Sequence, residues 1–196
     1  ELKMQIHKLK SKEGIEFKDL FILDPEIFDD QRGFFYESWN KNDFDLKINA
    51  KINFVQDNHS SSIKGVLRGL HYQTNPSPQG KLVRCIKGEV FDVAVDLRRN
   101  SMTFGMWFGV NLSSINKLQF WIPEGFAHGF LTISKSAEVC YKTTNYWNKD
   151  CEKSIRWNDE KLAINWPLNK INKNKPLLSR KDKEAPSFKE SYKYFD

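Results

Sequence analysis

The sequence predicts an all-β fold, a β-sandwich or jelly roll with a few short flanking helices. Apolar or alternating segments of strand length recur along the chain, and turn-forming residues separate them. Aromatic residues make up 14% of the 196 residues, which suits packed sheets better than a helical bundle. Hydrophobic residues make up 39%, enough for a core. We therefore expect one domain over residues 1–196, with residues 1–15 and 184–196 peripheral.

The first half of the chain holds several strand-like segments and one helix candidate. Residues 37–47 are the best candidate for a helix. A loop rich in Pro, Ser, Gln and Gly is expected at residues 74–80. Extended segments are expected at residues 19–24, 32–35, 51–58 and 66–73.

The second half begins with the clearest local pattern. Two alternating runs, residues 81–87 and 90–97, flank a glycine turn, which predicts a β-hairpin. A basic Asn/Lys loop at residues 169–175 leads to Ser179 and Asp182, whose spacing resembles a capping box at the start of a helix. Further strands are expected at residues 104–112, 118–122, 129–134 and 138–147.

Charge, cysteine content and hydropathy narrow the class of protein. The net charge of +6 suits an anionic partner, either nucleic acid or a phosphorylated small molecule. No basic helix or zinc-finger spacing accompanies the charge, which favours a solvated basic surface, and we expect no nucleic-acid partner. Three cysteines without a CxxC pair indicate neither a disulfide framework nor a structural zinc site, and fit a reducing cytoplasm. No apolar run of about 18 residues and no signal-peptide pattern occurs, so we expect a cytoplasmic protein with no membrane partner.

The four histidines have different sequence contexts. His7 lies in a charged stretch where we expect no function, and His59 lies in a polar, turn-like cluster that favours a structural role. His71 and His128 each interrupt an apolar or aromatic segment. Such a histidine is either a hydrogen-bonded core residue or a base or electrophile in a dry pocket, and the sequence leaves both open.

Strand parity places other polar side chains. Tyr141 and Trp147 share one face of the segment 138–147, so both can line one cavity. Lys81 shares a face with apolar residues of its strand. A lysine that points inward needs an anion or a developing negative charge, whereas a lysine at the mouth of a barrel needs nothing. Taken alone, Lys81 is therefore expected at the mouth, where it needs no charge partner.

The segment 66–73 raises a parity problem. Arg68 and His71 are three residues apart, so a flat strand directs them to opposite faces. A bulge at Gly69 would direct both to the same side.

Several familiar motifs are missing from the sequence. No His-x-His pair occurs, so a metal site of the kind common in metal-binding jelly rolls is not expected. There is also no Gly-x-Gly-x-x-Gly, no Gly-x-Ser-x-Gly and no Walker loop, the usual marks of nicotinamide binding, serine hydrolysis and nucleotide hydrolysis.

Eight separate motifs occur in order between about residues 19 and 182, and together they resemble one family. They are RGFFYES (32–38), FVQDNHS (54–60), VLRGLHYQ (66–73), KLVRC (81–85), FDVAVD (91–96), IPEGFAHGF (122–130), WNDE (157–160) and INWP (164–167). Each motif is weak alone, but the ordered set resembles the dTDP-4-dehydrorhamnose 3,5-epimerases.

The resemblance implies a cupin-like double-stranded β-helix, usually a homodimer, that uses no metal or organic cofactor. The family inverts C3 and C5 of dTDP-4-keto-6-deoxy-D-glucose by acid/base proton transfer α to the ketone, which gives dTDP-4-keto-L-rhamnose for dTDP-L-rhamnose biosynthesis. The sequence leaves two alternatives open. One is a relative on the same scaffold, either a ketoisomerase or an epimerase that acts at one carbon or on another nucleotide sugar. The other is a non-catalytic jelly roll that binds a sugar nucleotide or nucleic acid.

The resemblance also implies roles for particular residues. His71 matches the base, Asp182 the carboxylate that orients it, Tyr141 the acid on the opposite sugar face, and Lys81 the cation beside the C4 oxygen. Trp147 stands where the family often has a tyrosine stacked on the thymine. The full set of positions that match substrate contacts is Arg32, Glu37, Gln56, Asp57, Asn58, Arg68, His128, Trp147, Glu152 and Lys181.

Overall fold

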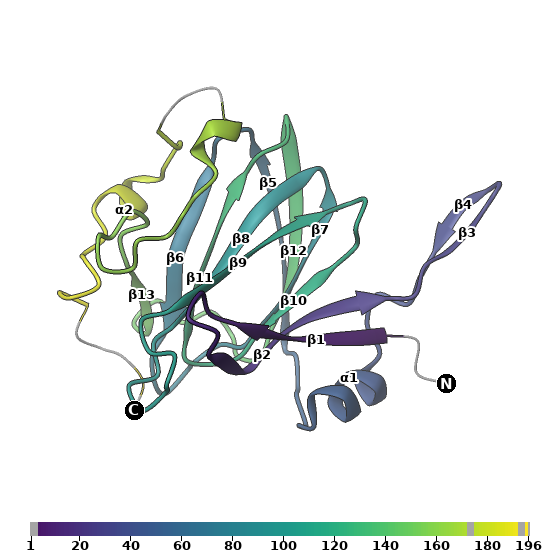
Figure 1. The fold of residues 1–196 in the computed structure, drawn as a ribbon, viewed down its shortest axis with the longest axis horizontal. Coiled ribbons are helices and arrows are strands. Elements are labelled where there is room, and N and C mark those ends of the chain that lie inside the picture. The colour runs from purple at the N-terminus through teal and green to yellow at the C-terminus, as the bar shows by residue number, and fades with distance from the viewer. Residues whose placement is uncertain (1–3, 172–174, 192–194, 196) are drawn as a thin grey trace.

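Two antiparallel sheets packed face to face make up most of the molecule (Figure 1). The computed structural model describes residues 4–171, 175–191 and 195. One sheet has six strands, in the order β1 (Met4–Lys10), β2 (Glu16–Pro25), β10 (Gln119–Ile122), β7 (Lys81–Lys87), β12 (Ser136–Thr143) and β5 (Gln56–Ile63). The other has five, in the order β13 (Glu152–Ser154), β6 (Leu67–Gln73), β11 (Phe126–Thr132), β8 (Glu89–Asp96) and β9 (Trp107–Ser113). The predicted jelly roll with few helices is confirmed.

Apolar alternation along the strands builds a core between the sheets and a second layer outside each of them. In β2, Leu20 and Ile22 face the other sheet, whereas Phe21 and Leu23 point outward against helix α1 (Lys41–Ile48). The outer face of the five-stranded sheet is covered by apolar residues of the C-terminal segment, which include Ile155, Leu162, Trp166 and Ile171. The five-stranded sheet and the part of the six-stranded sheet around β2, β10 and β7 are thus packed on both faces, which makes them rigid.

A short hairpin projects from this body at the right of Figure 1. It consists of β3 (Phe28–Asp30) and β4 (Gly33–Phe35), which pair only with each other. Phe34 and Phe35 are 58% and 71% exposed. The Lys117 ammonium lies 3.6 Å from the centre of the Phe34 ring, a cation–π contact between the hairpin and the body. We refer to residues 28–35 as the arm.

The hairpin predicted for residues 81–97 is wrong. β7 pairs with β10 and β12 in the six-stranded sheet, whereas β8 pairs with β9 and β11 in the other. Gly88 therefore lies at a corner where the chain passes from one sheet to the other. Its φ is +73°, and a Cβ there would lie 2.0 Å from the carbonyl oxygen of Ser136, so the close approach requires glycine.

Several predicted boundaries are also corrected. Helix α1 begins at Lys41 instead of residue 37, because the Asn40 side chain caps it by accepting hydrogen bonds from the N–H groups of Asn42 and Asp43. The extended segment expected at 51–58 is a strand only from Gln56, and it continues to Ile63. The strands expected at 104–112, 129–134 and 138–147 are Trp107–Ser113, Phe126–Thr132 and Ser136–Thr143.

The C-terminal segment contains two short helices. They are the 3₁₀ helix η1 (Leu168–Lys170) and α2 (Arg180–Lys183). Ser179 caps α2 by accepting from the backbone N–H of Asp182, as the capping pattern predicted. The loop predicted at residues 169–175 includes residues 172–174, which lie outside the described residues. Among the described residues, no helix is long and apolar enough to cross a membrane.

Candidate active site

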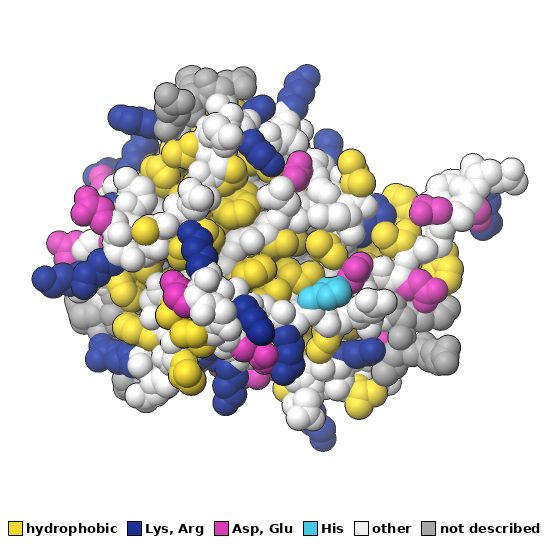
Figure 2. Space-filling model, viewed as in Figure 1, with side chains coloured by type: hydrophobic (Ala, Val, Ile, Leu, Met, Phe, Trp, Pro, Cys, Tyr) yellow, Lys and Arg dark blue, Asp and Glu magenta, His cyan; other side chains and the backbone are white. Residues whose placement is uncertain are grey.

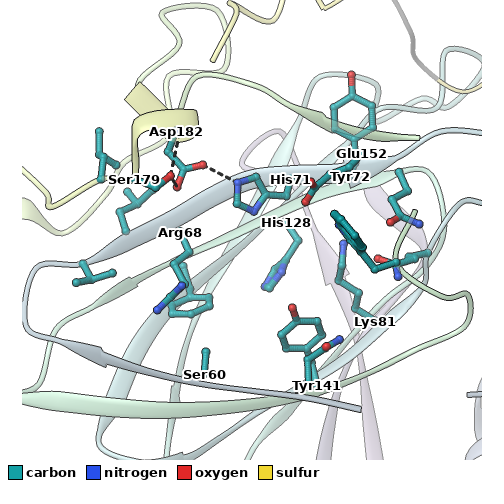
Figure 3. A pocket seen from close by; sticks show the side chains of 18 of the residues that line it. Ser60, Arg68, His71, Tyr72, Lys81, His128, Tyr141, Glu152, Ser179 and Asp182 are labelled. Atoms are coloured by element: carbon teal, nitrogen blue, oxygen red, sulfur yellow. Dashed lines mark hydrogen bonds and ion pairs between the residues drawn. The ribbon is translucent and has the colours of Figure 1, made fainter. Parts of the chain in front are cut away.

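A pocket of about 710 Å³ opens between the two sheets (Figure 3). β5, β7 and β12 of the six-stranded sheet form one wall, and β6, β11 and β13 of the other sheet form the facing wall. The C-terminal segment around α2 closes one side. The pocket therefore brings together residues that lie far apart in the sequence.

His71 and Asp182 form a hydrogen-bonded pair in this pocket. The imidazole Nε2 lies 2.5 Å from Oδ1 of Asp182, whose side chain is only 3% exposed. Burial alone would raise the pKa of Asp182. The bonds with His71 and Ser179, together with the backbone N–H of Gly69, hold this pKa below its ordinary value. Asp182 thus stays ionised and accepts from the imidazole.

The bulge predicted at Gly69 is confirmed. In the pairing of β6 with β11, His71 lies opposite His128 and Arg68 opposite Phe130, so β6 has one residue more than β11 between these pairs. Gly69 has a φ of +131°. The extra residue directs both Arg68 and His71 into the pocket.

Tyr141 lies on the wall opposite His71. It belongs to β12 of the six-stranded sheet, whereas His71 belongs to β6 of the five-stranded sheet. The two side chains point into the pocket from its two sides (Figure 3). Burial raises the pKa of the Tyr141 phenol, although the charge of Arg68 opposes this, so the phenol keeps its proton at neutral pH.

Lys81 lies inside the pocket, so the position expected at the mouth is wrong. Its side chain is 7% exposed and lines the pocket near the start of β7. Burial lowers its pKa to about 8, even though the negative charges of Glu152 and Asp92 favour the ammonium form. A buried cation with so little water around it is suited to receive a negative charge that develops on a ligand.

His128 has a buried acidic partner that the sequence analysis did not single out. Its Nε2 lies 2.8 Å and 3.0 Å from the two carboxylate oxygens of Asp92 on β8. Asp92 is fully buried, and burial raises its pKa. The sequence offers one signal for this pair, an acidic residue inside the alternating run 90–97. The register between β8 and β11 brings Asp92 to His128, and the sequence does not give that register.

Polar and aromatic side chains surround these central groups. Arg68 is held by Ser62, whose Oγ accepts from the guanidinium Nε at 3.0 Å. The backbone N–H of Trp147 donates to Oε1 of Gln56 at 3.1 Å, and the Trp147 indole donates to Glu152. The predicted site residues that line the pocket are Gln56, Asn58, Arg68, His71, Lys81, His128, Tyr141, Trp147, Glu152 and Asp182.

Four predicted contact residues do not line this pocket. Arg32 lies on the arm, where it pairs with Asp30 at 2.6 Å, and Glu37 is exposed just beyond the arm. Asp57 is exposed and pairs with Lys142 at 3.1 Å. Lys181 binds Glu152 at 2.6 Å and lines an adjacent pocket on the other side of β13.

The other two histidines lie outside the pocket. His7 lies on β1, 3.7 Å from Asp24. His59 lies on strand β5 and not in the predicted turn, and its Nε2 is 3.1 Å from Glu138 on the neighbouring strand. On the face shown in Figure 2, basic and acidic side chains are dispersed over the whole surface, and apolar side chains are exposed between them, most densely toward the middle.

The fold and the pocket together define a class of protein. Inverting a carbon next to a carbonyl requires a base on one side of the substrate and an acid on the other, with a cation near the oxygen that becomes negative. A jelly roll with an imidazole and a phenol on facing sheets and a buried ammonium in the same pocket meets these requirements, and the class that they define is an isomerase that works by proton transfer.

Comparison with known proteins gives the family. The family model described as dTDP-4-dehydrorhamnose 3,5-epimerase matches residues 14–190. The enzyme of that name from Salmonella typhimurium is 58% identical over 168 residues, which cover 86% of this chain and 90% of that protein.

Solved structures similar to this one point to the same family. The dTDP-4-dehydrorhamnose 3,5-epimerase of Elizabethkingia anophelis has a TM-score of 0.88 at 46% identity and covers 98% of this chain and 100% of its own. The dTDP-6-deoxy-D-glucose-3,5-epimerase of Legionella pneumophila, solved with dTDP-4-keto-L-rhamnose, has a TM-score of 0.85 at 48% identity over 94% of this chain and 92% of its own. The chain belongs to the dTDP-4-dehydrorhamnose 3,5-epimerase family.

Proposed function

We propose that this protein inverts C3 and C5 of dTDP-4-keto-6-deoxy-D-glucose to give dTDP-4-keto-L-rhamnose, in dTDP-L-rhamnose biosynthesis. The observation that carries the proposal is the placement of His71 and Tyr141 on facing sheets of one pocket. A sugar ring held between them has a base on one face and an acid on the other.

His71 starts each inversion as the base. Because an ionised Asp182 only accepts hydrogen bonds, the ring proton lies on Nε2 and the lone pair of Nδ1 is free. His71 takes the proton from the carbon next to the ketone, and the C–H electron pair forms a carbon–carbon double bond. The π electrons of the carbonyl move onto the C4 oxygen.

Lys81 and Tyr141 complete the step. The buried ammonium stabilises the enolate oxygen, and the Tyr141 phenol gives its proton to the same carbon from the opposite face. The C4 carbonyl then re-forms. Solvent removes the proton from His71 and returns one to Tyr141, and the second carbon reacts in the same way. Side chains supply every proton and charge, so the reaction as we propose it needs no metal or organic cofactor.

We further propose that the protein works as a homodimer, with the arm as the connection between copies. Arg32 matches a substrate contact of the family, but it lies on the arm and outside the pocket of its own chain. The exposed rings of Phe34 and Phe35 give the arm an apolar surface suited to a second copy. Arg32 and Glu37 would then contact the substrate in the neighbouring protomer.

The remaining assignments follow the same proposal. Lys181 pairs with Glu152 of the pocket and would reach the nucleotide when it is bound. The match of Asp57 to a substrate contact is corrected, because alternation along β5 directs Asp57 to the face opposite the pocket, where it pairs with Lys142. The diphosphate would bind guanidinium groups such as that of Arg68, and nucleic acid is not a partner. We place the reaction in the cytoplasm, which the three free cysteines Cys85, Cys140 and Cys151 support.

Isotope exchange tests the function directly. The protein is incubated with dTDP-4-keto-6-deoxyglucose in D₂O, and mass spectrometry follows the deuterium. We expect uptake at C3 and C5 together with formation of the L-rhamno product. Uptake at one carbon would contradict 3,5-epimerisation in favour of a single-carbon epimerase, and no uptake would contradict the proposed substrate.

A further inference from the structure

The carboxylate that orients His71 is itself held by a side chain that the mechanism has not used. Ser179 Oγ donates to Oδ2 of Asp182 at 2.9 Å, while Oδ1 of the same carboxylate faces His71 (Figure 3). The same Oγ accepts from the Asp182 backbone N–H at 3.1 Å. Ser179 therefore binds Asp182 at both its backbone and its side chain.

Three donors from two elements surround the Asp182 carboxylate. They are the His71 imidazole and the Gly69 backbone N–H from β6, and the Ser179 hydroxyl at the start of α2. Without the hydroxyl, rotation about the Cβ–Cγ bond of Asp182 would lose its restraint at Oδ2. Oδ1 would still accept from His71, but the plane of the carboxylate, and with it the orientation of the imidazole ring, would be less restrained.

We infer that Ser179 is a positioning residue for the epimerisation. Its hydroxyl binds Oδ2 of Asp182 and so fixes the carboxylate with Oδ1 directed at the His71 ring. The inference rests on the proposed function of His71 as the base. Ser179 acts through Asp182.

The hydroxyl also moderates the negative charge that His71 meets. A donor on Oδ2 draws charge away from Oδ1 and weakens the hold of the carboxylate on an imidazolium proton. Of the ionisable groups around the imidazole, Glu152 from β13 and His128 from β11 lie on the same wall of the pocket as His71, and Tyr141 from β12 lies across it. Glu152, His128 and Tyr141 form no hydrogen bond with Ser179, so removing the hydroxyl leaves their positions unchanged.

Two substitutions separate this role from helix capping. Ser179→Ala removes both the hydroxyl and the cap, whereas Ser179→Gly removes the hydroxyl but leaves a residue that is nearly as good at the N-cap position. We expect kcat to fall about ten-fold in both variants, with KM changed less than two-fold, as for other groups that orient a reactive side chain. We also expect the acidic limb of the kcat/KM profile to move to higher pH. Ser179→Thr, which keeps the hydroxyl, restores both.

The chain offers a matched control. Ser187 Oγ donates to the Glu190 carboxylate at 2.6 Å with the same three-residue spacing, but this pair is exposed and does not line the pocket. Ser187→Ala should leave kcat and the pH profile unchanged. Wild-type kinetics from Ser179→Gly, or loss of activity only in Ser179→Ala, would overturn the inference in favour of a capping role.

A measurement without substrate distinguishes this inference from the proposed function. NMR follows the His71 ring signal against pH in the wild type and in Ser179→Gly. A midpoint that moves to higher pH in the variant supports the inference even if the substrate is wrong, and an unchanged midpoint overturns it. An inactive wild-type protein with a shifted midpoint would contradict only the function.

Discussion

At the scale of single residues, the two facing groups have separable tasks. In the proposed mechanism His71 removes the proton and Tyr141 delivers one, and the two side chains belong to different sheets that line one pocket. We expect His71→Asn to abolish deuterium exchange at both carbons, because no other side chain replaces the base. We expect Tyr141→Phe to impair epimerisation more than exchange, because deprotonation survives while protonation from the opposite face is lost. Mass spectrometry and product analysis in D₂O measure both, and normal epimerisation by Tyr141→Phe would rule out the phenol as the acid.

The burial of Lys81 lowers the stability of the fold, and its proposed role beside the C4 oxygen explains why a buried lysine stands there. Burial lowers its pKa from 10.5 to about 8, and at about 1.4 kcal/mol per pKa unit this corresponds to about 3 kcal/mol lost from folding at neutral pH. The unfolded chain keeps the proton up to a higher pH than the folded one. The cost is therefore fully present below pH 8 and shrinks as pH rises from about 8 to 10.5.

Substituting Lys81 should separate stability from activity. Lys81→Met keeps the length of the side chain and removes the charge, so we expect a higher unfolding midpoint in urea at pH 7. We expect kcat to fall by ~10²–10³-fold, the usual effect of losing one donor to a developing oxyanion. Wild-type activity should decline as pH rises through about 8, where the ammonium loses its proton. A variant that is as active as the wild type would contradict the role of Lys81.

At the scale of the strand, the bulge in β6 depends on Gly69. A Cβ at Gly69 would lie 2.5 Å from the Cα of Gly129 and 2.8 Å from the His128 carbonyl oxygen, in addition to the strain of a φ of +131°. We expect Gly69→Ala to destabilise the fold by more than the ~1–3 kcal/mol of backbone strain alone. Gly14, with a φ of +82° and no atom within 4 Å of a Cβ, is the matched control. Denaturant unfolding of the two alanine variants compares them, and equal losses would show that the close contact is unimportant.

Comparing individual strands with their predictions shows which features of the fold can be predicted from the sequence and which cannot. The glycine before Glu89 was rightly placed at a turn, but a hairpin and a corner between sheets use the same turn residues. Only the pairing of β7 and β8 with distant strands separates the two, and local sequence carries no information about it. The polar second half of β5 was missed as a strand because its residues lack the apolar alternation on which the prediction relied.

The sequence predicts those site residues that are unusual in their local segment, such as a histidine in an apolar strand. His71 and His128 interrupt apolar segments, and Gly69 offers a way to direct two residues three apart to one side. Asp92 was missed because an acid in an alternating strand is usually expected to face water. The mouth position for Lys81 was favoured because parity gives the face of a residue but not its depth.

At the scale of the whole molecule, the arm predicts that two copies share each site. A protein with Arg32→Ala and one with His71→Asn are each expected to be nearly inactive. In a heterodimer, the Arg32→Ala chain keeps its own His71 and receives an intact arm from its partner, so one of two sites is complete. Heterodimers purified through two different tags should show about half of the wild-type activity. If Arg32 served its own chain, no site would be complete and the heterodimer would stay inactive.

The elements that hold the base are not equally anchored. His71 lies on a strand inside a sheet packed on both faces, whereas its partner Asp182 lies on the four-residue helix α2, whose one buried residue is Asp182 itself. Short elements with few buried side chains open at a lower free energy than central strands. On warming, the carboxylate should therefore leave the imidazole while the sandwich is still folded. Enzyme activity is then expected to be lost several degrees below the melting temperature, because the active site is disrupted before the sandwich unfolds.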